Sequence, residues 1–227
     1  MRSALQFLTI LPVPAPNAPP GAAAAWYPLV GALIGLLAWF LTSQSPLGAT
    51  LAIVAVVAVT GGLHEDGLAD VCDAVRAGRT RERMLEILKD SRIGAYGATA
   101  ITLSILVRWQ AMSKLSEPFL LWKFVLAFAV SRAAMIVLAA STPSAASGLG
   151  GTFRESLSKY AAPLAVIAVS ALAVGISAWP ALLVAVASVL FVRTWLMQRL
   201  GGFTGDCLGF QCQLTEASVL VALAWRA

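Results

Sequence analysis

Acidic side chains crowd into the segment GGLHEDGLADVCDA at residues 61–74. Four of the chain's eleven acidic residues, Glu65, Asp66, Asp70 and Asp73, lie within nine positions there. At about 100° per residue, a helix would bring the three aspartates within an arc of roughly 60° and leave Glu65 to one side. Carboxylates this close repel one another unless a cation lies between them. We therefore predict a divalent-metal site with these four acids as its candidate ligands.

The donor type favours Mg²⁺ or Mn²⁺ and phosphodiester chemistry. These cations take a few carboxylate oxygens and complete their shells with substrate phosphate and water, and they orient an attacking hydroxyl. Gly67 keeps one side of the helix slim enough for a phosphate or another backbone to approach. His64, the only histidine, could serve as a base or phosphate donor, although a lone histidine is more often an interfacial hydrogen-bonding residue. The alternative without metal chemistry is a solvated helix end that balances the basic residues after it.

The segment LKDSRIGAYG at residues 88–97 could supply phosphate contacts. Arg92 suits bidentate contact with a phosphate and Lys89 a point-charge contact, and Asp90 adds a carboxylate. Anchoring by basic residues beside a glycine-rich turn explains this segment equally well when it is considered alone. Its position one short helix away from the acidic residues favours the functional interpretation.

A second glycine-rich segment, GGFTGDCLGFQCQ at residues 201–213, carries Thr204 and Asp206. We predict that it is a flexible polar loop between two membrane spans, with backbone N–H groups that can approach a phosphate or nucleotide. An ordinary connecting loop is an equally good explanation of the segment by itself.

The composition requires a membrane around the elements that position these segments. The 227 residues are 59% hydrophobic and 12% charged, with a mean hydropathy of +0.83, whereas soluble domains are about half apolar and about a quarter charged. Lipid removes the need for a polar exterior and restricts the fold to helices or a closed barrel. Long apolar runs favour helices, so we predict an all-α, polytopic integral membrane bundle that forms a single domain over residues 1–227.

Hydropathy predicts six or seven transmembrane helices of about 20 residues each. The candidate spans are residues 25–42, 48–63, 97–113, 119–140, 160–178, 180–199 and 213–226. Prolines prevent residues 1–24 from continuing a helix, so we expect an interfacial segment there. Arg108 and Arg132 lie within apolar runs. They could contact substrate, but snorkelling of their long side chains toward the interface is the simpler interpretation.

The distribution of basic residues predicts the orientation. Segment 75–96 contains six Lys and Arg residues whereas the turn at 43–47 contains none, so the first is expected to be cytoplasmic. Within it, residues 78–90 alternate charged and apolar side chains, a pattern typical of an amphipathic helix on the membrane surface. The net charge of +5 is concentrated beside apolar runs, which indicates membrane orientation and no nucleic-acid partner.

Together, FLTILPVP at 7–14, GGLHEDGLADVCDA at 61–74, KDSRIGAYG at 89–97 and GGFTGDCLG at 201–209 closely resemble the cobalamin synthase family, adenosylcobinamide-GDP ribazoletransferase. The resemblance implies a Mg²⁺-dependent, multi-pass enzyme of the bacterial inner membrane with its active site facing the cytoplasm. Such an enzyme transfers the adenosylcobinamide-phosphate group of adenosylcobinamide-GDP to α-ribazole or its 5′-phosphate and releases GMP. This is the last nucleotide-loop assembly step of cobalamin biosynthesis.

In a mechanism compatible with both the residues and the resemblance, a metal held by Asp66, Asp70 and Glu65 bridges the diphosphate, and the 3′-hydroxyl of the ribazole attacks. Asp70 and Asp73 are the candidate catalytic residues, and Asp73 or another carboxylate would accept the hydroxyl proton. The candidate metal ligands are Glu65, Asp66, Asp70 and Asp73. The candidate substrate-binding residues are His64, Gly67, Lys89, Asp90, Arg92, Thr204 and Asp206.

Three alternatives remain open at this point. A lipid enzyme similar to the CDP-alcohol phosphotransferases shares part of the acidic pattern but differs in its spacing. A cation transporter would use intramembrane acids near the midplane, and an assembly subunit would have no chemistry of its own. Besides its substrates and the lipid bilayer, a second copy of the chain or other pathway enzymes are candidate partners.

Overall fold

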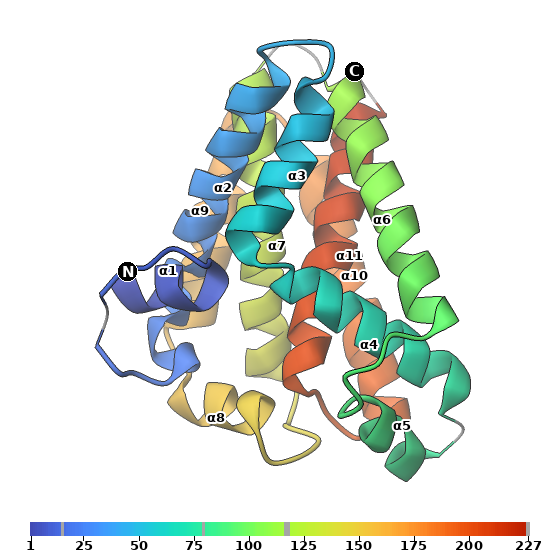
Figure 1. The fold of residues 1–227 in the computed structure, drawn as a ribbon. Coiled ribbons are helices and arrows are strands. Elements are labelled where there is room, and N and C mark those ends of the chain that lie inside the picture. The colour runs from blue at the N-terminus through green and yellow to red at the C-terminus, as the bar shows by residue number, and fades with distance from the viewer. Residues whose placement is uncertain (15, 79, 116–118, 226–227) are drawn as a thin grey trace.

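The computed structural model describes residues 1–14, 16–78, 80–115 and 119–225, which form a helical bundle (Figure 1). The described residues contain no strand; their one isolated β-bridge joins Ser144 to Phe203. In chain order the helices are α1 (Arg2–Leu8), the 3-10 helix η1 (Pro20–Trp26), α2 (Tyr27–Thr42), α3 (Gly48–Thr60), α4 (Leu63–Ala77), α5 (Arg81–Ile87), α6 (Ala95–Lys114), α7 (Leu120–Ser141), α8 (Leu149–Ser156), α9 (Ala161–Gly175), α10 (Trp179–Arg199) and α11 (Gly205–Ala224). The predicted all-α fold is confirmed.

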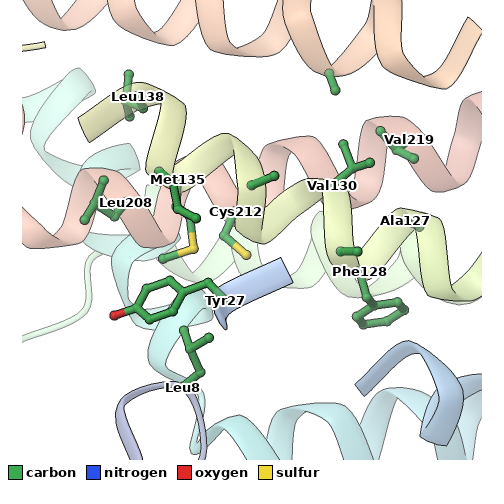
Figure 2. Close-up of a cluster of buried hydrophobic side chains, with 14 of the residues drawn as sticks. Leu8, Tyr27, Ala127, Phe128, Val130, Met135, Leu138, Leu208, Cys212 and Val219 are labelled. Atoms are coloured by element: carbon green, nitrogen blue, oxygen red, sulfur yellow. The ribbon is translucent and has the colours of Figure 1, made fainter. Parts of the chain in front are cut away.

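Helix α7 lies at the centre of the bundle and is buried along most of its length. Glycines let α2 come close to it, because a Cβ atom at Gly35 would lie 2.7 Å from the carbonyl oxygen of Phe124. Figure 2 shows side chains from α2, α7 and α11, among them Tyr27, Met135 and Cys212, gathered in the buried cluster. Side chains of α7 therefore form much of the core between these helices.

The outer surface is that of a membrane protein. Among the described residues, four helices are long and apolar enough to cross a bilayer, and up to six spans result if each of two bent helix pairs counts as one. Helix α10 exposes large apolar side chains such as Leu183, Leu190 and Phe191, which a soluble monomer rarely does in a continuous patch. Helix α6 is long enough to span but is not among the apolar candidates.

A sharp bend separates α3 from α4. Gly61 and Gly62 have φ values of +63° and +70°, a left-handed conformation that glycine adopts readily. The bend between the two helices is 87°, so α4 crosses the bundle at a steep angle to α3 (Figure 1). The acidic segment therefore forms a helix, as expected, but the helix turns away from the preceding span.

Two expected boundaries differ from the structure. Residues 205–213 were expected to be a loop, but α11 already begins at Gly205. Thr204 has the extended backbone of an N-cap residue and Asp206 lies in the first turn, where a negative charge suits the helix dipole. The amphipathic segment 78–90 does contain a helix, α5, which is shorter than expected and buries Met84.

Candidate functional site

Glu65 is the most enclosed acid of α4, with only 5% of its surface exposed. Its Oε1 accepts hydrogen bonds from Arg108 Nη2 at 2.9 Å and from Gln213 Nε2 at 2.9 Å. The two donors come from α6 and α11, so Glu65 joins α4 to both helices. Its Oε2 has no hydrogen-bond partner.

The buried charges continue beyond Glu65. Arg108 Nη1 donates to Glu216 Oε1 at 3.0 Å, and Arg132 donates to Glu216 Oε2 and to Ser131 Oγ. Both arginine side chains are almost completely buried. The snorkelling expectation for Arg108 and Arg132 is therefore wrong, because carboxylates from other helices meet these guanidinium groups inside the bundle.

Asp73 holds the start of α6. Its two carboxylate oxygens accept hydrogen bonds from the backbone N–H groups of Gly94, at 2.7 Å, and Gly97, at 2.9 Å. A Cβ atom at either glycine would collide with this carboxylate. The predicted proximity of the acidic segment to residues 89–97 is confirmed, and the glycines allow their backbone to approach Asp73.

Asp66 and Asp70 differ from these two acids. Within the described part of the chain, neither carboxylate accepts a hydrogen bond or joins an ion pair. Asp66 is exposed and Asp70 is half-buried. Asp206 of α11 contributes a third negative charge that acts on both. These three residues, called the aspartate cluster below, carry negative charge that no cationic side chain balances directly.

A close helix crossing brings Asp206 to α4. A Cβ atom at Gly67 would lie 2.6 Å from the backbone oxygen of Asp206 and 3.1 Å from the Cα atom of Gly209. The hydrogen side chain of Gly67 allows this approach, and a Cβ atom at Gly209 would in turn lie 3.2 Å from the Cα atom of Gly67. Segment 201–209 therefore lies beside the acidic helix.

Two cavities flank the aspartate cluster. The lysine cavity, of about 130 Å³, has Lys89, Thr204 and Asp206 in its wall. Thr204 Oγ1 also donates to Asp206 Oδ2 at 3.1 Å. The elbow cavity, of about 620 Å³, lies at the α3–α4 bend and has Asp66 and Glu65 in its wall. Three of the expected substrate-binding residues thus meet in the lysine cavity.

The other expected substrate residues lie elsewhere. His64 is 1% exposed, and neither of its ring nitrogens has a hydrogen-bond partner. Arg92 Nη2 pairs with Asp90 Oδ2 at 2.7 Å on the surface, with 87% of the Arg92 side chain exposed. Hydrogen bonds from Arg92 lower the pKa of Asp90 to about 2, so this surface pair stays ionised at neutral pH.

The described residues contain no group of three His, Cys, Asp or Glu side chains already converged on a metal position. The aspartate cluster nevertheless fits the chemistry of Mg²⁺, which usually binds one or two carboxylates and takes its remaining ligands from phosphate and water. The carboxylates of this cluster, which no cationic side chain balances directly, are the groups that make this fit. Glu65 already accepts hydrogen bonds from an arginine and an amide side chain, and Asp73 accepts them from backbone N–H groups.

Several residues that shape the site were either missed or misinterpreted from the sequence. Arg108, Glu216 and Arg132 fix one end of α4, and Gly209 allows α11 to approach it. A signal was present, because two arginines in apolar runs require nearby carboxylates, and Glu216 lies in the last apolar run. No local pattern indicated which acid would pair with which arginine.

Comparisons with known proteins identify a family for this chain. The sequence model of a family described as cobalamin-5-phosphate synthase matches residues 1–224. An adenosylcobinamide-GDP ribazoletransferase of Pseudomonas putida strain GB-1 is 38% identical, over 97% of this chain and 96% of the relative. Proteins of the same name from Ectopseudomonas mendocina and Vibrio cholerae are 39% and 37% identical, and the alignments cover 98% and 88% of this chain and 97% and 82% of the relatives. No solved structure shows significant similarity.

Proposed function

We infer that this chain, which belongs to the cobalamin-5-phosphate synthase family, is an adenosylcobinamide-GDP ribazoletransferase. The observation that carries this conclusion is the family match over residues 1–224. It favours this activity over a lipid phosphotransferase, a cation transporter or an assembly subunit. The reaction completes the nucleotide loop of cobalamin.

The transfer breaks a phosphoanhydride bond of the donor and forms a new phosphoester bond to the acceptor. A ribose hydroxyl oxygen of α-ribazole, or of its 5′-phosphate, bonds to the phosphorus nearest the corrinoid. The bond from that phosphorus to the bridging oxygen of the diphosphate breaks, GMP leaves, and the hydroxyl proton passes to a base. The protein has to position the two reactants and balance the charge on the phosphates.

We assign these tasks to the aspartate cluster and Lys89. Asp66 and Asp206 would hold Mg²⁺, which neutralises phosphate charge when bound. Asp70, whose carboxylate accepts no hydrogen bond, is best placed to take the hydroxyl proton. Lys89 would bind a phosphate oxygen of the donor in the lysine cavity. Glu65 and Asp73 would position α4 through their hydrogen bonds and not touch the reactants.

The proposed site faces the cytoplasmic side of a bacterial inner membrane. Helices α5 and α8 lie at the end of the bundle opposite the α2–α3 turn (Figure 1). The basic residues of segment 75–96 belong to that end, which supports a cytoplasmic position under the positive-inside rule. Cytoplasmic nucleotides would then reach the aspartate cluster directly.

The test is GMP release by the detergent-purified protein from adenosylcobinamide-GDP and α-ribazole, with and without a chelator. We expect release to require Mg²⁺ and to fall at least about 100-fold in Asp66→Asn and Asp70→Asn, because charge stabilisation of this kind contributes on that scale. Glu82→Gln, which removes an exposed acid of α5, is the matched control and should keep full activity. Unchanged turnover in both aspartate variants would rule out the assignment of these residues.

A further inference from the structure

The elbow cavity is lined mainly by residues to which the proposed function assigns no role. It forms where the N-terminal segment packs against the α3–α4 bend, and Ile101 of α6 closes another side. The backbone N–H of Ile10 donates to the carbonyl oxygen of Val59 at 2.8 Å, which fixes the N-terminal segment at the bend. Phe7 stacks on Tyr27 with ring centroids 5.6 Å apart. This wall is therefore anchored to the bundle.

The wall combines apolar and hydrogen-bonding surfaces. Phe7, Ile10, Leu63 and Ile101 supply aromatic and branched aliphatic groups, and the two carboxylates lie beyond them. Such a combination suits a flat aromatic ring attached to a group that carries hydroxyls.

The cavity wall contains no Lys or Arg side chain among its described residues. A diphosphate would therefore meet two carboxylates there without a cationic side chain. The first backbone N–H groups of α4 can still donate hydrogen bonds to a phosphate. The first N–H groups of a helix lack intrahelical acceptors, and Gly62 provides no side-chain cap for them. They could accommodate one phosphate monoester near the cavity edge, but not the full charge of the donor.

We propose that the elbow cavity is the acceptor subsite and binds an aromatic nucleoside, or its 5′-phosphate, through its base and ribose. This proposal rests on the proposed function and assigns its two substrates to two separate cavities. The donor diphosphate lies in the lysine cavity, where Lys89 supplies a positive charge. The acceptor base lies against Phe7, Ile10 and Ile101.

The position of the aspartate cluster agrees with this division. Asp66 belongs to the wall of the elbow cavity and Asp206 to the wall of the lysine cavity. The negative charges of Asp66 and Asp206 both act on Asp70. An acceptor hydroxyl entering from one side and a phosphate entering from the other would therefore meet at these carboxylates.

The experiment measures KM for each substrate in variants that fill the elbow cavity from two elements. Ile101→Trp fills it from α6, and Ile10→Trp, at a side chain that is 67% exposed, fills it from the N-terminal segment. We expect each variant to raise KM for α-ribazole about tenfold or more, because pocket shape discriminates on that scale. KM for adenosylcobinamide-GDP should stay within about twofold, a shift that corresponds to little binding energy.

Leu103→Trp is the matched control, since Leu103 lies on α6 two residues from Ile101, is 56% exposed and is not part of the cavity wall. Both KM values should be unchanged in this variant. Lys89→Ala should show the reciprocal effect and raise KM for the corrinoid donor. If Ile101→Trp does not fold, as judged by gel filtration, Ile10→Trp carries the test.

The outcomes separate this proposal from the proposed function. A rise in the donor KM alone, or no change in either KM, in the tryptophan variants would overturn the subsite assignment while leaving the activity in place. If the wild-type protein releases no GMP, the proposed function fails. Equilibrium dialysis of α-ribazole then tests the cavity directly, because binding that Ile101→Trp does not weaken would overturn the subsite as well.

Discussion

Asp70 and Asp73 are separated by less than one turn of α4 but have opposite surroundings. Asp73 accepts two backbone hydrogen bonds from the start of α6, whereas Asp70 accepts none and lies near three other carboxylates. A partnered carboxylate stabilises the fold, while an unpartnered one among like charges does not. Substitution of Asp73 should therefore affect mainly stability, and substitution of Asp70 mainly catalysis.

We predict that Asp73→Asn lowers the free energy of unfolding by about 1–2 kcal/mol, because a cap-like carboxylate is replaced by a neutral amide with one acceptor oxygen. Asp70→Asn should unfold at the same temperature as the wild type or above it, since the substitution removes like-charge repulsion. Thermal unfolding in detergent, followed by circular dichroism, measures both. A larger stability loss in Asp70→Asn than in Asp73→Asn would contradict this division of roles.

The sequence showed which acids could do chemistry, but not which of them have structural partners and which are left for the reaction. Spacing alone placed Asp66, Asp70 and Asp73 on one helical face, and the helix is present. The partners that distinguish them, such as Gly94 for Asp73 and Arg108 for Glu65, come from α6. Helical periodicity carries no information about such contacts between elements.

At the scale of elements, the crossing of α4 and α11 determines the distance between Asp206 and the acidic helix. We predict that Gly67→Ala destabilises the protein by about 1–3 kcal/mol, the usual effect of overpacking. The added methyl group would lie 2.6 Å from the backbone oxygen of Asp206, so the helices have to separate and GMP release should also fall. Thermal unfolding and the turnover assay measure these effects.

Gly175→Ala is the control for this prediction, because a Cβ atom there meets nothing within 4 Å. Alanine favours helices over glycine by about 1 kcal/mol, so this variant should be neutral or more stable at the end of α9. Equal effects of the two substitutions would show that helix propensity, and not the crossing, governs Gly67.

Glycines also explain why the start of α11 was predicted wrongly from the sequence. Most spans were anticipated from hydropathy, with boundaries near those of α2, α7 and α10. Segment 201–213 was expected to be a loop because of its glycines, yet Gly205 and Gly209 lie in α11. Gly209 serves the helix crossing, whereas Gly61 and Gly62 serve the bend. Composition does not distinguish a glycine that breaks a helix from one that lets two helices touch.

At the scale of the whole molecule, four helices meet at one set of buried charges. Glu65 of α4, Arg108 of α6, Arg132 of α7 and Glu216 of α11 are linked by ion pairs. Two positive and two negative groups balance, so the set is neutral inside an apolar bundle. The sequence could not reveal this balance, because its members are spread from residue 65 to residue 216.

We predict that Arg132→Met destabilises the protein by about 3–5 kcal/mol, because removing one member of a buried ion pair leaves an uncompensated charge. Arg83→Met is the matched control, since Arg83 pairs with Glu86 at 2.6 Å on the exposed surface of α5, where such pairs contribute about 0–1 kcal/mol. Thermal unfolding in detergent compares the two. Because Arg132 pairs with Glu216 and so joins α7 to α11, a loss confined to the control range in Arg132→Met would mean that apolar packing, and not this ion pair, fixes α7 against α11.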